Sequence, residues 1–235
     1  MSAGTSLPDE LLDRLCEAHA NVIVERAPDW WALILLACDV VGAGVESSAA
    51  AELAGLPATA GRSECEPVLL QMLTDLGLPR VPDHPRVLRH LVADGDIDTV
   101  LTMMPLAEIA AAWLRHWSRS SGEKGADDPD QWADDLWRSR AWYEGARPRL
   151  ELVLELIRQA QNDAELRQIA ASCLENCICE DEATLQWVEE EAALSPKFRQ
   201  ALTGVWVYDV LSPASFQRVQ RAAGAELSNP RGRPD

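Results

Sequence analysis

The segment from Arg147 to Leu194 constrains the fold more than any other, because its apolar residues recur with the period of an α-helix. Its middle part carries one unbroken apolar stripe, with the spacing i, i+3, i+4, i+7, i+8, i+11 and i+12. The stripe consists of Leu166, Ile169, Ala170, Cys173, Leu174, Cys177 and Ile178. The part before it repeats the pattern, starting at Leu150 and Val153. Helices with so wide an apolar face must be covered by other helices, so we expect this pair to be the centre of a helical domain.

The rest of the chain also consists of amphipathic segments separated by glycine, proline and charged turns. These segments predict helices at residues 8–27, 29–42, 46–56, 63–76, 85–93, 96–104, 106–118 and 130–144, and further helices that begin near residues 181, 195 and 212. Alternation with a period of two is found from Val205 to Val210. The Ser195-Pro196 helix start and the spacing of Phe198 and Leu202 nevertheless favour a helix there.

These segments predict an all-α fold, an orthogonal multi-helix array with two sub-bundles, for which a solenoid-like stack is an alternative arrangement. Met104-Pro105 marks the expected boundary between the two parts. We expect an N-terminal helical sub-bundle over residues 1–104 and a C-terminal helical domain over residues 105–223. Residues 224–235 have no apolar period and are predicted to form a disordered tail.

The chain of 235 residues is strongly acidic, with a net charge of −17 and 47% hydrophobic residues. An acidic surface repels phosphate backbones, so we do not expect binding to nucleic acid, whereas a basic protein partner would be attracted. The longest apolar run, Trp30 to Cys38, is too short to cross a bilayer, and the N-terminus lacks the pattern of a signal peptide. Six cysteines in a chain without a signal peptide are typical of a protein whose thiols stay reduced. We therefore expect a cytoplasmic protein that does not associate with membranes.

The sequence contains no common catalytic or nucleotide-binding motif, since HExxH, GxSxG, GxxxxGK and GxGxxG are all absent. Cys173, Cys177 and Cys179 are close enough in sequence to suggest a zinc site. However, the first two lie on the apolar stripe, and no histidine follows His116. We interpret them as small buried side chains, with Cys179 as the exposed one.

Five aspartates near the start of the helix expected at 130–144 could gather a cation. They are Asp127, Asp128, Asp130, Asp134 and Asp135. We interpret most of them instead as charges at a helix N-terminus, where the macrodipole favours negative charge. We expect no catalytic residue, no metal ion, no cofactor and no enzymatic activity. A helical metal-dependent enzyme built on such acids is the remaining enzymatic alternative.

The candidate partner-binding residues lie along the helix that begins near residue 181. They are Glu180, Asp181, Glu182, Trp187, Glu189, Glu190 and Glu191. Acids at the C-terminal end of a helix oppose its dipole, so the last three are unexpected in a purely structural helix. Trp187 is offset from the apolar stripe, and tryptophan beside acids is a frequent interface anchor. The alternatives are a solvated acidic face and a tryptophan packed between helices.

Four short stretches of the second half carry a resemblance to a known family: AAWLRHWSR, PDQWADDLW, LELVLELI and IAASCLEN. Over about residues 104–222 the chain resembles an uncharacterised bacterial family, a helical domain of unknown function in which a leucine-acid pair like Leu174-Glu175 ends a helix. The first half, through VGAGVESSAAAELAGLPA and DGDIDTV, is similar to small acidic bacterial proteins that often look like immunity proteins for secreted toxins. The resemblance supplies no catalytic residue.

We therefore expect a non-enzymatic acidic binding protein, and most concretely an immunity protein that neutralises a cognate bacterial toxin by direct binding. Its partner would be a basic protein, because complementary charge speeds association and toxins that act on nucleic acid are often basic. The alternative is a helical scaffold or adaptor in a bacterial protein assembly.

Overall fold

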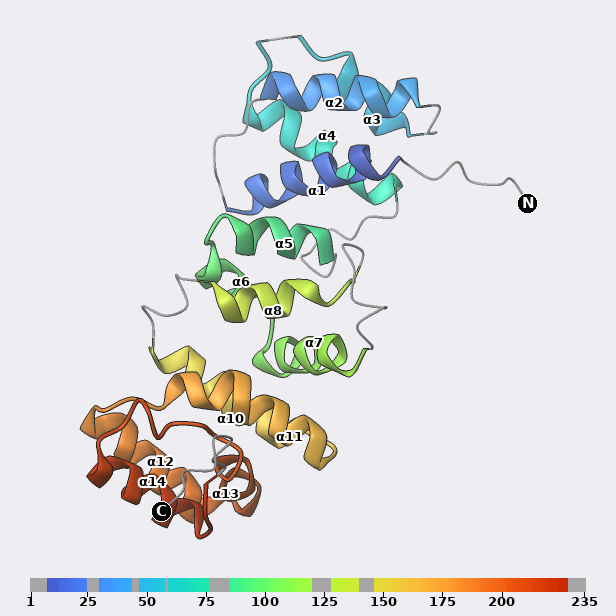
Figure 1. The fold of residues 1–235 in the computed structure, drawn as a ribbon. Coiled ribbons are helices and arrows are strands. Elements are labelled where there is room, and N and C mark those ends of the chain that lie inside the picture. Colours follow the sequence, from blue (N-terminus) through green and yellow to red (C-terminus); the bar gives the residue numbers. More distant parts are fainter. Residues whose placement is uncertain are drawn as a thin grey trace. The chain divides into compact units, whose positions relative to one another are not determined.

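The computed structural model describes residues 8–24, 30–43, 47–57, 59–76, 85–119, 128–139 and 146–227. Every regular element within these ranges is a helix, so the predicted all-α fold is confirmed (Figure 1). The chain divides into two compact units, Met1–Met104 and Pro105–Asp235. Of the tail expected at 224–235, residues 228–235 lie outside the described residues. Leu227, which is described, is buried.

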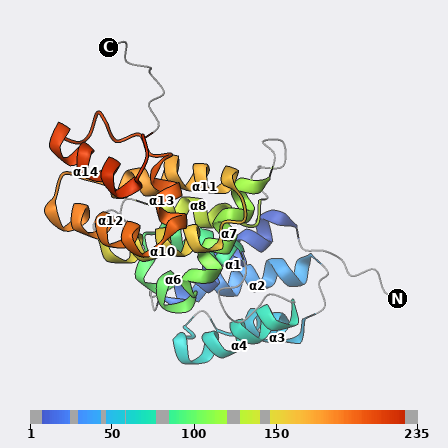
Figure 2. The ribbon, with the colours of Figure 1, turned by 90° about the horizontal axis from the view of Figure 1, so that it is seen from below.

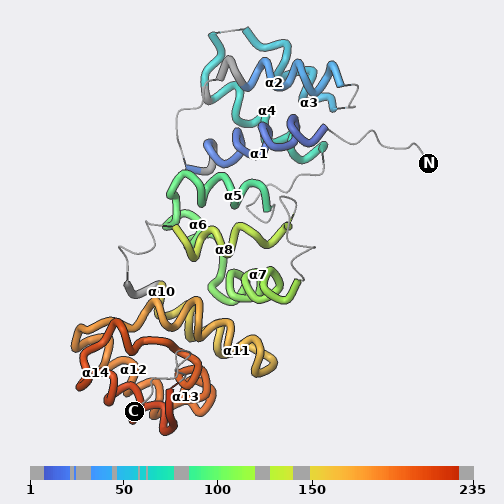
Figure 3. The backbone as a smooth tube through the Cα atoms, in the orientation of Figure 1, coloured from blue at the N-terminus to red at the C-terminus, as the bar shows by residue number. Residues whose placement is uncertain are grey.

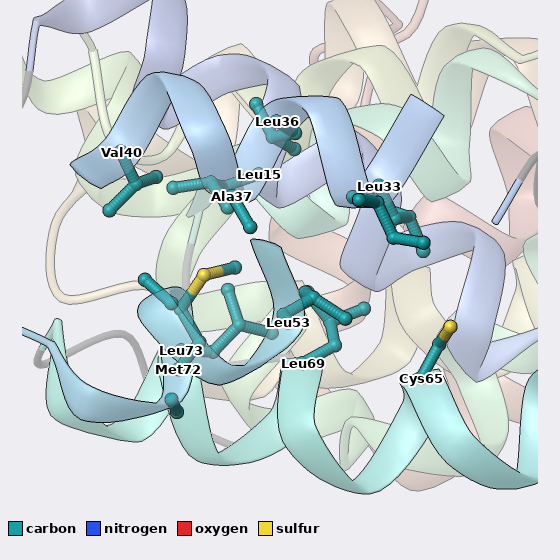
Figure 4. Close-up of a cluster of buried hydrophobic side chains, with 14 of the residues drawn as sticks. Leu15, Leu33, Leu36, Ala37, Val40, Leu53, Cys65, Leu69, Met72 and Leu73 are labelled. Carbon is teal, nitrogen blue, oxygen red and sulfur yellow. The ribbon is translucent and has the colours of Figure 1, made fainter. Parts of the chain in front are cut away.

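The first unit is a cluster of short helices. Those described are α1 (Asp9–Ile23), α2 (Trp30–Gly42), α3 (Ser48–Ala54), α4 (Arg62–Asp75), α5 (Pro85–Ala93) and α6 (Ile97–Met103). Helix α2 packs against α3, α3 packs against α4, and α1 packs against α5. Helices α1 to α4 share a core that contains Leu33, Leu53, Leu69 and Met72 (Figure 4). Helix α2 is apolar nearly all round. Its Leu33 is buried in the core, whereas its Leu35 is exposed.

The second unit contains the amphipathic segment from Arg147 to Leu194. Its described helices are α7 (Leu106–Ser118), α8 (Gln131–Arg138), α10 (Ala146–Gln159), α11 (Asp163–Ile169), α12 (Glu182–Leu194), α13 (Pro196–Leu202) and α14 (Pro213–Ala223). Helix α7 packs against both α8 and α10, and α12 packs against α13 and α14. The view in Figure 2 again shows α12, α13 and α14 grouped together. Trp113, Leu136, Leu156 and Phe198 are buried in this unit.

Each of the last three helices begins with a side-chain cap. The side chains of Asp181, Ser195 and Ser212 accept hydrogen bonds from backbone N–H groups of the first turns of α12, α13 and α14. Proline follows both serines at the first helical position, where its missing N–H leaves no hydrogen bond unmade. The two Ser-Pro helix starts predicted from the sequence are therefore confirmed.

The predicted single helix through residues 166–178 is wrong. Helix α11 ends at Ile169, a π-helical turn spans Ala170–Leu174, and a 3-10 turn spans Glu175–Cys177. Figure 3 traces the backbone of α10 and α11 as a tube. A π turn spaces its hydrogen bonds differently from an α-helix, so carbonyl groups near it need other donors. The Ser172 carbonyl accepts hydrogen bonds from Trp137 Nε1 of α8 at 3.1 Å and from Asn176 Nδ2 at 2.7 Å.

The apolar stripe itself is buried as expected, although its backbone is not a continuous α-helix. All seven stripe residues are at most 8% exposed. The predicted burial of Cys173 and Cys177 is thus confirmed, and Cys179 is exposed. Burial raises the pKa of the Cys177 thiol to about 11, so this thiol is protonated at neutral pH.

The predicted helix through Val205 and Trp206 is also wrong. Helix α13 ends at Leu202, and the chain to Ser212 is non-helical. Its side chains instead follow the alternation visible in the sequence, with Val205 and Val207 buried and Trp206 exposed. Valine and tryptophan lose little conformational freedom in a non-helical backbone. The period-two alternation therefore predicts this segment better than the preceding helix start does.

Among the described helices, no single one has the length and apolar character needed to cross a bilayer. Helices α6 and α7 meet these two criteria when they are counted as one bent pair.

Candidate binding surface

The acidic residues predicted as a binding site are distributed along α12, from the residue pair before it to its last turns. Asp181 is the N-cap, where its carboxylate accepts hydrogen bonds from the Thr184 N–H at 2.9 Å and from Cys179 Sγ at 2.7 Å. The hydrogen bonds from Cys179 and Thr184 lower the pKa of Asp181 to about 2. Asp181 therefore begins the helix as well as adding charge to the surface.

Glu182 and Glu189 share one cation, Arg218 of α14. The Arg218 guanidinium donates to Glu182 Oε2 at 2.7 Å and Oε1 at 3.0 Å, and to Glu189 Oε1 at 2.8 Å and Oε2 at 2.9 Å. These hydrogen bonds lower the pKa of both carboxyl groups. Two of the predicted binding residues are thus engaged within the chain, and they join α12 to α14.

The remaining predicted residues are placed differently from one another. Glu180 accepts hydrogen bonds from the Ser212 N–H at 2.8 Å and from Ser215 Oγ at 2.7 Å. The half-buried Trp187 ring packs edge-on against Phe198 of α13, with ring centroids 5.4 Å apart. Glu190 is exposed and accepts a hydrogen bond from Gln186, and Glu191 is half-buried. The partner-binding role of these residues stays a prediction, although five of the six acids accept hydrogen bonds from within the chain.

Sequence reasoning missed the loop from Thr203 to Ser212, which we call the Trp206 loop. A carboxylate holds the backbone near each end: Glu175 accepts from the Trp206 N–H at 3.1 Å and Glu180 accepts from the Ser212 N–H at 2.8 Å. Burial raises the pKa of Glu175, and the Trp206 N–H partly offsets this effect. The alternation of VWVYDV was the signal that could have identified this loop.

The Trp206 loop presents apolar side chains to solvent. Trp206 is 46% exposed and Val210 is 62% exposed, whereas Val207 and Leu211 anchor the loop to the core. Asp209 between them is exposed too. Because the loop is held by its buried residues and by two carboxylates, it cannot bury these side chains by a small rearrangement. Exposed tryptophan on a fixed backbone is a typical interface anchor.

The aspartates considered as cation ligands do come together, but around side-chain cations. Asp128 and Asp130 are 2% and 5% exposed, and the Arg119 guanidinium donates to both, at 2.5 Å and 2.6 Å. Arg115 donates to both oxygens of Asp130, at 2.8 Å and 3.2 Å. Asp130 stands at the N-cap position of α8, yet its side chain does not cap the helix. Asp130 therefore lies at the helix N-terminus, as expected for a negative charge, but its carboxylate binds Arg115 and Arg119 instead of capping the helix.

The same network encloses His116 and Asp134. His116 Nδ1 lies 2.7 Å from Asp128 Oδ2, and its Nε2 lies 4.0 Å from Asp134 Oδ2. Asp134 accepts hydrogen bonds from Trp117 Nε1 at 3.1 Å and pairs with Arg138 at 2.9 Å. No group of acids, histidines or cysteines suited to a metal ion is found among the described residues. Asp127 lies outside the described residues.

Burial opposes the ionisation of Asp128, but hydrogen bonds from the Asp130 N–H and from His116, together with the Arg119 charge, lower its pKa overall. Asp128 is therefore a carboxylate at neutral pH, paired with nearby cations. The network joins α7 to α8.

Residues 120–227 match the model of a family of unknown function (DUF6869). The match covers α8 to α14, and with them the Trp206 loop and all the predicted binding residues. It confirms an uncharacterised domain in the second half of the chain, whereas the bacterial source and the likeness to immunity proteins stay predictions. No curated protein and no solved structure matches the chain significantly.

Proposed function

We propose that this chain is a non-catalytic protein-binding module, and more narrowly an immunity protein that neutralises a basic bacterial toxin by direct contact. The observation that carries the proposal is the Trp206 loop, which holds Trp206 and Val210 in solvent at 46% and 62% exposure. Burying a large apolar side chain contributes about 1.5–3 kcal/mol, so a partner that covers this loop gains binding energy.

The construction of the loop favours binding for a second reason. Its two carboxylate hydrogen bonds, from Glu175 and Glu180, hold the backbone near Trp206 and Ser212 before any partner arrives. A partner then spends little free energy on ordering the loop. Tryptophan adds a large contact area with few rotatable bonds.

The charge of the chain favours a basic partner. The net charge is −17, and three acids of this region are exposed. Asp209 lies in the Trp206 loop, Glu180 accepts a hydrogen bond from the Ser212 N–H at the end of the loop, and Asp181 follows Glu180 in sequence. Such a surface attracts a basic protein over a distance of about one Debye length, ~10 Å at 0.1 M salt. It also selects against nucleic acid, whose phosphates would be repelled.

The test is co-purification of the tagged full-length chain at low salt, followed by mass spectrometry of the bound proteins. The double variant Trp206→Ser, Val210→Ser is compared with Leu194→Ser, which makes the same kind of change at a residue 79% exposed at the end of α12. We expect a basic protein that the wild type and Leu194→Ser retain and the double variant loses. Equal retention by all three proteins would refute the role of the Trp206 loop.

Toxin neutralisation is tested separately by producing the captured protein in growing cells. If it arrests growth, and the wild-type chain but not the double variant restores growth, the immunity role is supported. If it does not affect growth and instead belongs to a stable multiprotein complex, the chain is an adaptor, and the narrower proposal fails while the binding surface stands.

A further inference from the structure

A pocket of about 380 Å³ lies between α7 and α11 in the second unit. Its size is within the range of small-molecule sites, about 300–1,000 Å³. The residues that matter for recognition are the aromatic and polar ones, Trp113, Trp117, Ser118, Asn162, Glu165 and Gln168. The proposed protein-binding surface includes none of them.

The wall from α7 is aromatic. The rings of Trp113 and Trp117 lie 5.7 Å apart and are tilted by 40°. Trp113 is fully buried, whereas Trp117 is partly exposed and its Nε1 donates to Asp134 at 3.1 Å. This hydrogen bond fixes the indole ring and uses its one N–H donor. The ring thus offers a ligand its π-electron surface, which attracts cations.

The polar groups around the pocket have spare acceptor capacity. The Glu165 carboxylate accepts from the Gln161 N–H at 2.6 Å and from Asn162 Nδ2 at 2.8 Å. Among the described residues, no basic side chain forms an ion pair with it. Each of its oxygens has a further lone pair. The Gln168 side chain makes one long hydrogen bond to the described residues, from Nε2 to Ser172 Oγ at 3.4 Å, so its amide oxygen is available.

Ser118 adds a further acceptor, because its hydroxyl hydrogen is used in a bond to the Arg115 carbonyl at 2.9 Å. Asn162 is already engaged as the N-cap of α11. A ligand in the pocket therefore meets one unpaired negative charge, neutral acceptors and an indole ring. An anionic ligand would be repelled by Glu165, whereas a flat cation with several N–H donors fits all three.

We infer that this pocket binds a guanidinium group, carried either by a free small molecule or by an arginine side chain of a protein. The guanidinium ion is planar, stacks on aromatic rings and pairs with carboxylates through two parallel N–H donors. An ammonium ion is a compact and strongly hydrated charge, and uses the indole surface less well.

The test is a titration of the full-length chain, with ¹⁵N-labelled tryptophan, with arginine amide. The indole signals of Trp113 and Trp117 are assigned with single Trp→Phe variants. We expect saturable shifts of the Trp117 signal with arginine amide, smaller shifts with lysine amide, and none with citrulline amide, which has the same shape but no charge. Equal shifts with arginine amide and citrulline amide would overturn the inference.

The variant Glu165→Gln keeps a side-chain acceptor for Gln161 and removes the charge. Charge-assisted hydrogen bonds contribute enough that its affinity for arginine amide should fall about tenfold or more. The matched control Glu108→Gln removes one charge from an exposed site in the first turn of α7 and should bind like the wild type. Equal weakening in both variants would show a general charge effect and no pocket.

A second variant, Gln168→Met, keeps the side-chain length and removes the neutral acceptor, so it tests the pocket even if Glu165→Gln does not fold. We expect severalfold weaker binding, and unchanged binding would count against the inference. The source of the group is assigned by comparing arginine amide with a blocked Gly-Arg-Gly peptide. Tighter binding of the peptide indicates a protein ligand, tighter binding of arginine amide indicates a small molecule, and no binding of either overturns the inference.

Discussion

His116, Asp128 and Asp130 are each at most 5% exposed, so the network between α7 and α8 buries several charged or titratable groups in one place. Ionised groups in a protein interior are tolerated only while every charge has its partner, because an unpaired one keeps the whole cost of its desolvation. Arg119 reaches both aspartates and is 27% exposed at its side chain, which moderates that cost. The stability that this network gives the second unit therefore depends on all of its ion pairs being present, and not on any single pair.

Replacing Asp128 with asparagine is expected to lower the free energy of unfolding by about 2–4 kcal/mol, because His116 and Arg119 lose their carboxylate. Urea denaturation followed by circular dichroism measures this change. Asp209→Asn removes one charge from an exposed residue of the Trp206 loop and should change stability by less than about 0.5 kcal/mol. The interpretation fails if the two variants are equally stable.

The sequence indicated that aspartates gather near α8, but it did not identify what they bind. Arg115 is in α7 and Arg119 directly follows this helix, so the pairing depends on how α7 packs against α8. In the same way, Glu182 and Glu189 were predicted to belong to a binding surface, whereas their partner Arg218 is on α14. Periodicity predicts which face of a helix is buried and does not indicate which distant cation lies opposite a given acid.

At the scale of elements, the π turn Ala170–Leu174 explains why the centre of the second unit differs from the predicted helix. The stripe is buried as expected, because apolar spacing alone determines that face. The π turn depends on donors outside the segment, such as Trp137 for the Ser172 carbonyl, and these have no local signature. The Trp206 loop did have one, its alternation, which the stronger helix-start signal obscured.

The π turn also explains the glycine at the start of the Trp206 loop. A Cβ atom on Gly204 would lie 2.9 Å from the Cβ of Ala170, closer than two such atoms approach in proteins. Gly204→Ala should therefore lower the free energy of unfolding by about 1–3 kcal/mol through overpacking. Urea denaturation measures the loss.

The double variant Gly204→Ala, Ala170→Gly supplies the control for this steric account. Removing the Ala170 methyl group makes room, so the two changes together should cost less than the sum of the single changes. Additive losses would mean that the close approach of Gly204 and Ala170 is not the cause.

At the scale of the whole molecule, stability depends on ionised carboxylates. The net charge is −17 at pH 7, and the pKa values of Asp128, Asp181, Glu182 and Glu189 are lowered by the contacts described above. A group whose pKa is lower in the folded state contributes stability above its unfolded pKa and loses it as the pH falls through the folded pKa. The ordinary values are 3.8 for aspartate and 4.5 for glutamate.

We therefore expect the free energy of unfolding to fall as the pH is lowered from about 4.5 towards about 2, the pKa of Asp181. Urea denaturation at several pH values and constant salt measures the slope. In Arg218→Met the pKa values of Glu182 and Glu189 should return towards their ordinary values, so this variant should show a shallower slope. An unchanged slope would show that the Arg218 contacts do not contribute.

Arg218 also acts as an internal competitor for any ligand of the α12 acids. It occupies Glu182 and Glu189 through four hydrogen bonds, from a side chain that is 23% exposed. An incoming lysine or a dissolved cation would have to displace a guanidinium that is tethered and already in place, and so has the advantage of a high effective concentration. We therefore expect a threshold, in which an isolated positive charge leaves Arg218 in place and only a surface with several correctly spaced charges replaces it.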